Sequence, residues 1–207
     1  MTAASAPRSA PAAARNAAPI GQVVADWLAP FEGTVLEVGC GTGEHAAACS
    51  ALTPHLCWLP TDREPDVATI MAWRERAAHP ERVAAPAALD VDDVSHWRRF
   101  EQVAAVFSVN TLHIMSWNSV TRLFASAAAA CRAGGLLLIY GPLHVRGQAT
   151  SPGNAVFDTQ LRDADVGMGI RDLEAVRSEA SGRGWIERAH YAMPANNQML
   201  VWQRDDT

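Results

Sequence analysis

Three glycines at alternate positions follow a short apolar run in the sequence Val35-Leu36-Glu37-Val38-Gly39-Cys40-Gly41-Thr42-Gly43. The β-branched and apolar residues before the glycines are typical of a buried central strand. Because glycine lacks a Cβ, the backbone of such a turn bends sharply and allows a ligand to approach closely. Glu37 lies two places before the first glycine, where the strand ends. The pattern predicts a strand, a ligand-binding turn formed by Gly39, Gly41 and Gly43, and then a helix.

Two adenosine-containing cofactors bind turns of this kind. A dinucleotide site has the spacing Gly-x-Gly-x-x-Gly and places a pyrophosphate against a helix N-terminus. Here position 44 is Glu, and an acidic side chain in the first helical turn would repel that pyrophosphate. S-adenosylmethionine has no phosphate and carries a sulfonium cation, so it tolerates an acidic rim. The turn therefore favours S-adenosylmethionine, with a tight strand-to-helix turn that binds nothing as the alternative.

Polar residues also follow the next predicted strands. A carboxylate at Asp62 can accept two hydrogen bonds from vicinal ribose hydroxyls, although an Asp in this place also serves as a turn or helix cap. Asp90 can accept from an adenine amino group while Val91 offers its backbone N–H; the alternative is a solvated acidic turn. Asn110 follows a fourth strand, where we expect the methionine part of the cofactor to reach the substrate, and it is predicted to contact the cofactor. Ligands of open parallel sheets bind at these carboxyl ends.

His113 is the candidate general base, because imidazole has an ordinary pKa near 6.5 and can remove a proton from an attacking hydroxyl or amine. The alternative is a histidine that packs beneath the adenine or bonds to the backbone. Methyl transfer from a sulfonium depends mainly on alignment, so a base is not obligatory. The loops expected to face the pocket supply six candidate substrate contacts: Trp117, Tyr140, His144, Asn154, Asp158 and Asn196.

The composition limits the class of protein. The chain has 207 residues, a formal net charge of −5, 49% hydrophobic residues and 19% charged residues, which is ordinary for one globular domain. An acidic chain without a basic run argues against a nucleic-acid partner. The four cysteines have no C-x-x-C spacing, which predicts reduced thiols and no metal site. With no apolar stretch of membrane-spanning length, we expect a cytoplasmic monomer or homodimer without a membrane partner.

Alternating strands and helices predict an α/β fold with a mainly parallel sheet. We expect strands at 35–38, 56–62, 83–89, 103–109 and 136–140, and helices at 20–28, 44–52, 64–78 and 120–131, the last of them ended by Gly134-Gly135. A long polar connection over 141–154 is predicted to be a lid or substrate loop. Short helices at 157–162 and 171–180 precede an antiparallel hairpin of strands at 185–193 and 198–204. Residues 1–14, rich in Ala and Pro, are predicted to be a disordered tail before a single domain at 15–207.

In order and spacing, Glu37, the three glycines, Asp62, Asp90 and Asn110 resemble the class I S-adenosylmethionine-dependent methyltransferases. More narrowly, short segments spread over residues 15–204 resemble an uncharacterised methyltransferase-like family, the domain of unknown function 938. They are residues 15–16, 41–46, 110–114, 140–142, 150–154, 169–173 and 193–197.

This resemblance implies a Rossmann-like, doubly wound, seven-stranded and mostly parallel sheet whose last strand is antiparallel. It implies that Arg15 and Asn16 fold over the cofactor, where a guanidinium can pair with the cofactor's carboxylate. The expected reaction moves a methyl group from S-adenosylmethionine to an O, N or S nucleophile on a small molecule and releases S-adenosylhomocysteine. DNA amino-methyltransferases have an Asn/Asp-Pro-Pro-Tyr/Phe loop where this chain reads Ser108-Val109-Asn110-Thr111. Together with the acidic charge, this difference favours a small molecule or a protein side chain as the substrate. The alternatives are a non-catalytic cofactor-binding or scaffold protein and a nicotinamide-dependent oxidoreductase, which Glu44 disfavours.

Overall fold

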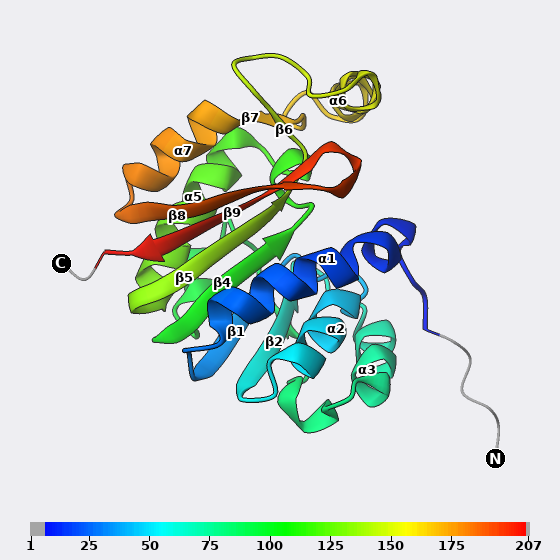
Figure 1. Cartoon of the computed structure of the whole chain (residues 1–207), viewed down its shortest axis with the longest axis vertical. Helices are drawn as coiled ribbons and strands as arrows, with labels where there is room; N and C mark the ends of the chain where they lie inside the picture. Colours follow the sequence, from blue (N-terminus) through cyan, green and yellow to red (C-terminus); the bar gives the residue numbers. More distant parts are fainter. Residues whose placement is uncertain (1–6, 206–207) are drawn as a thin grey trace. The chain divides into compact units, whose positions relative to one another are not determined.

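The computed structural model describes residues 7–205 and shows an α/β fold (Figure 1). The chain forms two compact units, Met1–Leu89 and Asp90–Thr207. The strands form a seven-stranded sheet of order β3-β2-β1-β4-β5-β9-β8, which confirms the predicted fold class. The prediction that residues 15–207 are a single domain stays a prediction.

The first unit is built on three parallel strands. Strand β1 (Gly33–Val38) pairs with β2 (Leu56–Asp62), and β2 pairs with β3 (Ala87–Ala88). The helices of this unit are α1 (Pro11–Leu28), α2 (Glu44–Leu52), α3 (Val67–Arg76) and the short 3-10 helix η1 (Pro80–Arg82). Residues 35–38 of β1 are all buried, as expected for a strand of a parallel sheet.

Helix α1 corrects the predicted N-terminal tail. It begins at Pro11, so residues 11–14 are helical. Proline is tolerated at the first helical position because an N–H there has no intrahelical partner anyway. Ile20, Val24 and Leu28 are fully buried at helical spacing, and each such side chain contributes roughly 2 kcal/mol to stability. The rest of the predicted tail includes residues 1–6, which lie outside the described residues.

The second unit has four strands of the main sheet. Strand β4 (Val103–Val109) is parallel to β5 (Cys131–Gly141), β5 is antiparallel to β9 (Asn197–Arg204), and β9 is antiparallel to β8 (Trp185–Met193). The C-terminal antiparallel hairpin is therefore confirmed. The α-helices of the second unit are α4 (Val94–Trp97), α5 (Trp117–Ala130), α6 (Pro152–Ala164) and α7 (Leu173–Ser181). Its 3-10 helices are η2 (Leu112–Ile114) and η3 (Pro194–Asn196). Strands β6 (Leu143–His144) and β7 (Arg171–Asp172) form a separate parallel pair.

Helix α5 packs as its apolar stripe predicts. Ser116 caps its first turn by accepting a hydrogen bond from the Ser119 amide. The stripe residues Val120, Leu123, Phe124 and Ala127 are buried. Phe124 meets Trp202 of β9 edge to face, with ring centroids 5.7 Å apart, and accepts a hydrogen bond from the Trp185 indole at its carbonyl. These contacts join α5 to the C-terminal hairpin.

The prediction that Gly134-Gly135 ends α5 is wrong. The helix ends at Ala130, and both glycines lie inside β5, where the pairing jumps from Val103–Cys131 to Ala105–Leu136. A Cβ on Gly135 would lie 2.5 Å from the Cys131 sulfur. The glycines therefore permit an irregular strand start that no larger residue would fit.

Other boundaries differ because side-chain caps and proline act locally. Asp66 caps α3, so the helix predicted from residue 64 starts later. The strand predicted over 83–89 pairs with β2 as an isolated bridge at Val83 and as the short strand Ala87–Ala88. The pairing is interrupted before Ala87, since Pro86 has no N–H to donate. The polar connection predicted over 141–154 contains the short strand β6. Ser151 caps α6, so this helix begins before residue 157 and is longer than the predicted one. Residues 171–172 are β7, so the helix predicted from 171 begins after them.

Candidate cofactor site

The glycine turn after β1 has the backbone that its sequence predicts. Gly39, Gly41 and Gly43 have φ values of +73°, +53° and +79°, all in the left-handed region that favours glycine. A Cβ on Gly43 would lie 2.9 Å from Cγ2 of Ile70, so this glycine is needed for packing against α3. A Cβ on Gly41 would meet nothing within 4 Å. The turn is therefore packed from behind at Gly43 and open to a ligand at Gly41.

Asp62, the last residue of β2, is bound to this turn. Its Oδ2 accepts a hydrogen bond of 2.9 Å from the Gly41 amide, and its Oδ1 accepts one of 2.8 Å from the Arg63 amide. Each carboxylate oxygen has two lone pairs, so both oxygens can still accept from a hydroxyl. Asp62 thus acts as a local cap and keeps the acceptor capacity that a ribose requires.

Glu37 lies beneath the turn and is 1% exposed. It accepts a hydrogen bond from the Ala46 amide in the first turn of α2, while its Oε2 has no hydrogen-bond partner among the described residues. Burial, followed by the charge of Asp62, raises the pKa of Glu37 to about 8, and the Ala46 hydrogen bond opposes this shift. A bound proton or a cationic group would complete the bonding of this carboxyl.

Arg15 and Asn16, predicted to fold over the cofactor, both lie on α1. Arg15 is exposed. Asn16 is 7% exposed, and its Oδ1 has no hydrogen-bond partner among the described residues. Their contacts with a cofactor stay a prediction.

The first unit fits S-adenosylmethionine better than a dinucleotide. Two buried oxygens, Glu37 Oε2 and Asn16 Oδ1, are acceptors that lack a donor, and the cofactor's ammonium group is a donor. The buried Glu44 occupies the first turn of α2, the place where a dinucleotide's pyrophosphate would lie.

The sequence analysis did not predict the contact in which Ser9 donates a 2.8 Å hydrogen bond to Glu44. The segment before α1 is rich in Ala and Pro and contains no motif that indicates such a contact.

In the second unit, Asp90 forms the acidic turn that was its alternative interpretation. Its Oδ1 accepts from the Asp92 amide at 2.9 Å, and its own amide donates to Nδ1 of His96 at 3.0 Å. The Val91 carbonyl accepts from the Trp97 indole at 3.3 Å. Contacts of Asp90 and Val91 with adenine stay predictions.

Asn110 follows β4 in the left-handed region, with φ of +58°, which Asn tolerates better than most residues. Its amide donates to the Tyr140 carbonyl at 2.8 Å, which holds it at the carboxyl end of β4 beside β5. This conformation is rare for a residue other than glycine, and contact of Asn110 with the cofactor stays a prediction.

His113 is buried in η2 with its ring edge to face against Phe157, the centroids being 5.2 Å apart. Burial, with a further contribution from the charge of Arg171, lowers the pKa of His113 to about 4. The imidazole is therefore neutral near pH 7, but a group with so low a pKa gives a small driving force for proton removal. The His113 ring packs against Phe157, and its role as a general base stays a prediction.

The candidate substrate residues form two pairs in the second unit. His144 Nε2 lies 3.5 Å from Asp158 Oδ2, and Asp158 also accepts from the Ile170 amide at 2.6 Å and from Arg162 at 2.9 Å. The Asn154 amide group donates to the carbonyl of Asn196 at 3.2 Å. The remaining two residues lie at element ends: Trp117 is half-buried at the start of α5, and Tyr140 is buried near the end of β5. Their contacts with a substrate stay predictions.

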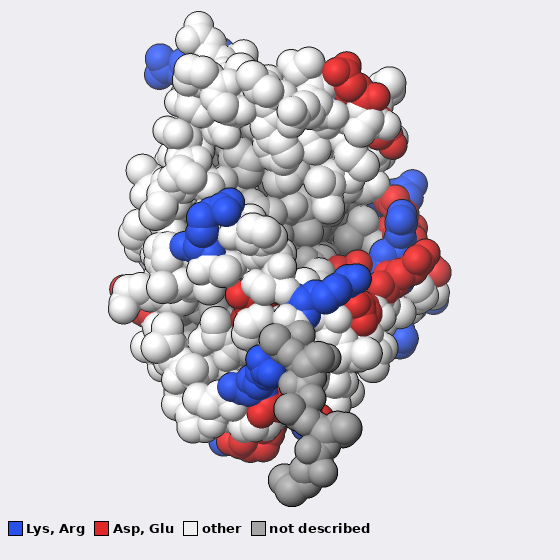
Figure 2. Space-filling view, turned by 90° about the vertical axis from the view of Figure 1, so that its right-hand side faces the viewer, with Lys and Arg blue, Asp and Glu red and all other residues white. Residues whose placement is uncertain are grey.

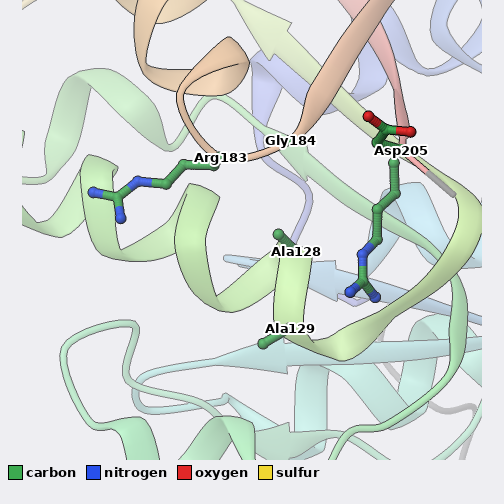
Figure 3. Close-up of a pocket in the computed structure, with 6 residues that line it drawn as sticks. Ala128, Ala129, Arg183, Gly184 and Asp205 are labelled. Atoms are coloured by element: carbon green, nitrogen blue, oxygen red, sulfur yellow. The ribbon is translucent and has the colours of Figure 1, made fainter. Parts of the chain in front are cut away.

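A hollow of about 250 Å³ in the second unit is lined by Ala128, Ala129, Arg183, Gly184, Arg204 and Asp205 (Figure 3). It lies beside the end of α5 and the end of β9, where the Arg204 guanidinium donates to the Cys131 carbonyl at the start of β5. This is the amino end of β5, opposite the carboxyl end at which ligands of such sheets bind. We therefore do not assign the cofactor or the substrate to it.

Charge and membrane features of the described residues are unexceptional. On the face that Figure 2 shows, basic and acidic side chains lie beside one another and form no continuous basic area. Within residues 7–205, no helix combines the length and apolar character needed to cross a bilayer, and no three His, Cys, Asp or Glu residues gather as a metal site.

Solved structures with the same fold are methyltransferases. An O-methyltransferase family protein from Burkholderia thailandensis matches 91% of this chain and 56% of its own, with a TM-score of 0.80 and 16% identity. An O-methyltransferase family 2 protein from Planctomyces limnophilus, in complex with apigenin, matches 93% of this chain and 60% of its own, with a TM-score of 0.77 and 20% identity. Human N-acetylserotonin methyltransferase, in complex with S-adenosylmethionine, matches 89% of this chain and 51% of its own, with a TM-score of 0.71 and 16% identity.

At these identities the likeness shows the fold, and the chain spans between 51% and 60% of the length of these three proteins. The family assignment is direct. The profile of a family described as "Protein of unknown function (DUF938)" matches residues 7–204, nearly the whole chain, so this chain belongs to the DUF938 family.

Proposed function

We propose that this protein is an S-adenosylmethionine-dependent methyltransferase that acts on a small molecule. The observation that carries the proposal is the open glycine turn after β1, joined to Asp62 by the 2.9 Å hydrogen bond from the Gly41 amide. This joins a ligand-accessible backbone to a carboxylate that can accept from ribose hydroxyls. The methyltransferase fold of the solved structures supports the same assignment.

In this proposal, the first unit holds the cofactor. Gly39, Gly41 and Gly43 let its methionine part approach the backbone, and Asp62 accepts from the ribose. Glu37 Oε2 accepts from the cofactor's ammonium group, which compensates for the burial of the carboxyl. When bound, the cofactor supplies an activated methyl group on a sulfonium leaving group. Arg15 and Asn16 are further proposed contacts in this unit, and mutation can also test the contacts that the sequence predicts for Asp90, Val91 and Asn110.

We infer that the methyl acceptor is an oxygen nucleophile, since the solved structures named above include two O-methyltransferase family proteins. The residues of the second unit that the proposal assigns to the acceptor are Trp117, Tyr140, His144, Asn154, Asp158 and Asn196. A neutral His113 can accept a hydrogen bond from the acceptor, and alignment rather than proton removal accounts for most of the rate. A cofactor-binding protein without catalysis remains the second candidate.

Calorimetric titration tests the cofactor site. Wild-type protein is expected to bind S-adenosylmethionine and S-adenosylhomocysteine and not NADH. Gly41→Val and Asp62→Ala are each expected to weaken binding by about tenfold or more, equivalent to about 1.4 kcal/mol. Absence of binding to wild-type protein that is folded by circular dichroism would refute the proposal.

The second unit offers a matched control. Gly147 also has a left-handed φ, +72°, with nothing within 4 Å of its Cβ position, and its amide donates to Asp172 at 2.5 Å. Gly147→Val and Asp172→Ala therefore impose the same backbone strain and the same lost hydrogen bond outside the cofactor site. They are expected to leave the affinity unchanged. If wild type binds, a screen of phenols and other hydroxyl compounds with a labelled methyl donor distinguishes an enzyme from a cofactor-binding protein.

A further inference from the structure

The segment before α1 makes three side-chain contacts within the first unit. The Arg8 guanidinium lies 3.1 Å from Oδ2 of Asp66. The Trp73 indole donates a 2.9 Å hydrogen bond to the Arg8 carbonyl. The Ser9 hydroxyl donates a 2.8 Å hydrogen bond to Oε2 of Glu44. In Figure 1 this coil runs down from the start of α1 beside α3. Residues 8 and 9 are therefore held in place by both α2 and α3.

Two of the three partners, Glu44 and Asp66, lie at the starts of α2 and α3, and Trp73 lies further along α3. Glu44 opens α2 directly after Gly43 of the glycine turn. Asp66 caps α3 by accepting from the Thr69 amide, and it follows Asp62 by four positions. Since these helices follow β1 and β2, a segment tied to both starts crosses the carboxyl ends of those strands, where Gly41 and Asp62 meet.

We propose that residues 8–16, the N-terminal strap, close over bound S-adenosylmethionine and slow its release, with Arg8 and Ser9 as the latch. This inference rests on the proposed function. Asn16 lies at the far end of the strap, and its buried Oδ1, which has no hydrogen-bond partner among the described residues, is an acceptor that this proposal assigns to the cofactor. Arg8 and Ser9 act through the strap and are positioning residues.

The latch is weak enough to open in each catalytic cycle. The Arg8 side chain is 77% exposed and that of Asp66 is 39% exposed. Exposed ion pairs of this kind contribute about 0–1 kcal/mol and weaken as salt rises. Within the helical part of the strap, the buried residues are the small Ala13 and the polar Asn16, whereas Ile20, Val24 and Leu28 anchor the rest of α1. The strap can therefore open while the rest of the helix stays folded.

The test compares dissociation rates of S-adenosylhomocysteine by stopped-flow measurement. The triple variant Arg8→Ala, Ser9→Ala, Trp73→Phe removes all three contacts while it keeps the apolar ring of residue 73. It is expected to release the product about tenfold faster, whereas the single variant Arg8→Lys, which keeps the charge and the other two contacts, is expected to stay close to the wild-type rate. Higher salt is expected to speed release from the wild type more than from the triple variant.

The matched control is Arg183→Ala. It breaks an exposed ion pair of 2.8 Å to Glu179 in the second unit, away from the proposed cofactor contacts, and is expected to leave the dissociation rate unchanged. A second readout needs no variant: bound S-adenosylhomocysteine is expected to slow tryptic cleavage after Arg8. If the product leaves the triple variant within twofold of the wild-type rate, or gives no protection at Arg8, the strap proposal is wrong while the cofactor site stands. A wild-type protein that binds no product overturns both.

Discussion

The amide of Gly41 donates a 2.9 Å hydrogen bond to Oδ2 of Asp62, which joins the turn after β1 to the end of β2. A second link runs beside it, since the Cys40 amide donates to the Thr61 carbonyl at 2.9 Å. The glycine turn is thus held by the neighbouring strand before any ligand binds. Such preorganisation lowers the entropy that binding must remove, because the turn and the carboxylate do not need to be ordered by the cofactor.

Gly43 is predicted to be a stability residue and Gly41 a binding residue. Gly43→Ala is expected to lower the free energy of unfolding by about 2–4 kcal/mol, because it adds a 2.9 Å contact with Ile70 to the cost of a left-handed alanine. Gly147→Ala has the same backbone cost without the contact and is expected to lose about 1 kcal/mol. Urea unfolding measures both, and equal losses would contradict the assigned clash.

Glu37 is predicted to make stability depend on pH. Its pKa is raised from 4.5 to about 8 by burial, so between these values the folded state holds a proton that the unfolded chain releases. The stabilisation is complete below pH 4.5 and is lost as pH rises through 8. Between pH 5 and pH 8 the wild type is expected to lose roughly 3 kcal/mol more than Glu37→Gln, which cannot ionise. Urea unfolding at several pH values checks this, and parallel curves would exclude it.

His113 is predicted to stay neutral down to about pH 4, its lowered pKa. Between pH 6.5 and 4, His113 binds a proton in the unfolded chain but not in the folded protein. Burial of the neutral ring therefore favours the folded state less and less as pH falls through this range. Phe157→Ala opens the ring to water and is expected to raise the pKa toward 6.5, as followed by NMR titration. Val156→Ala on the same helix is the control, since Val156 is 59% exposed. An unchanged pKa in Phe157→Ala would mean that the Arg171 charge, not burial by Phe157, dominates.

Asp158 is predicted to hold α6 and the loop before β7 together. It accepts from the Ile170 amide and from Arg162, and it lies 3.5 Å from His144. Asp158→Ala leaves the Ile170 amide without its acceptor, which is expected to cost about 1–3 kcal/mol and to speed hydrogen exchange at that amide. Asp165→Ala is the control, because the Asp165 side chain accepts a hydrogen bond of 2.7 Å from the Gly167 amide, two positions away, and not from Ile170. Unchanged exchange at Ile170 would show that another contact holds the loop.

The sequence by itself determined the elements whose signals are local. The strands at 56–62 and 103–109, the helix at 44–52 and the C-terminal hairpin follow from apolar runs, turn residues and helical stripes, and they were predicted at or within a residue or two of their ends. The glycine turn was also predictable, because three alternate glycines encode a left-handed backbone directly.

Only the tertiary structure decided the features that depend on distant neighbours. The pKa of Glu37 and that of His113 follow from burial, which no local pattern reports. The irregular start of β5 exists because β4 pairs with it on both sides of Gly134-Gly135, which in sequence read as a helix stop. The contacts of Arg8 and Ser9 join residues more than thirty positions apart, from a segment without any motif. Local sequence determines local conformation. Contacts between distant residues form only when the chain folds, and these contacts decide which groups are buried, which are charged and which lie close to one another.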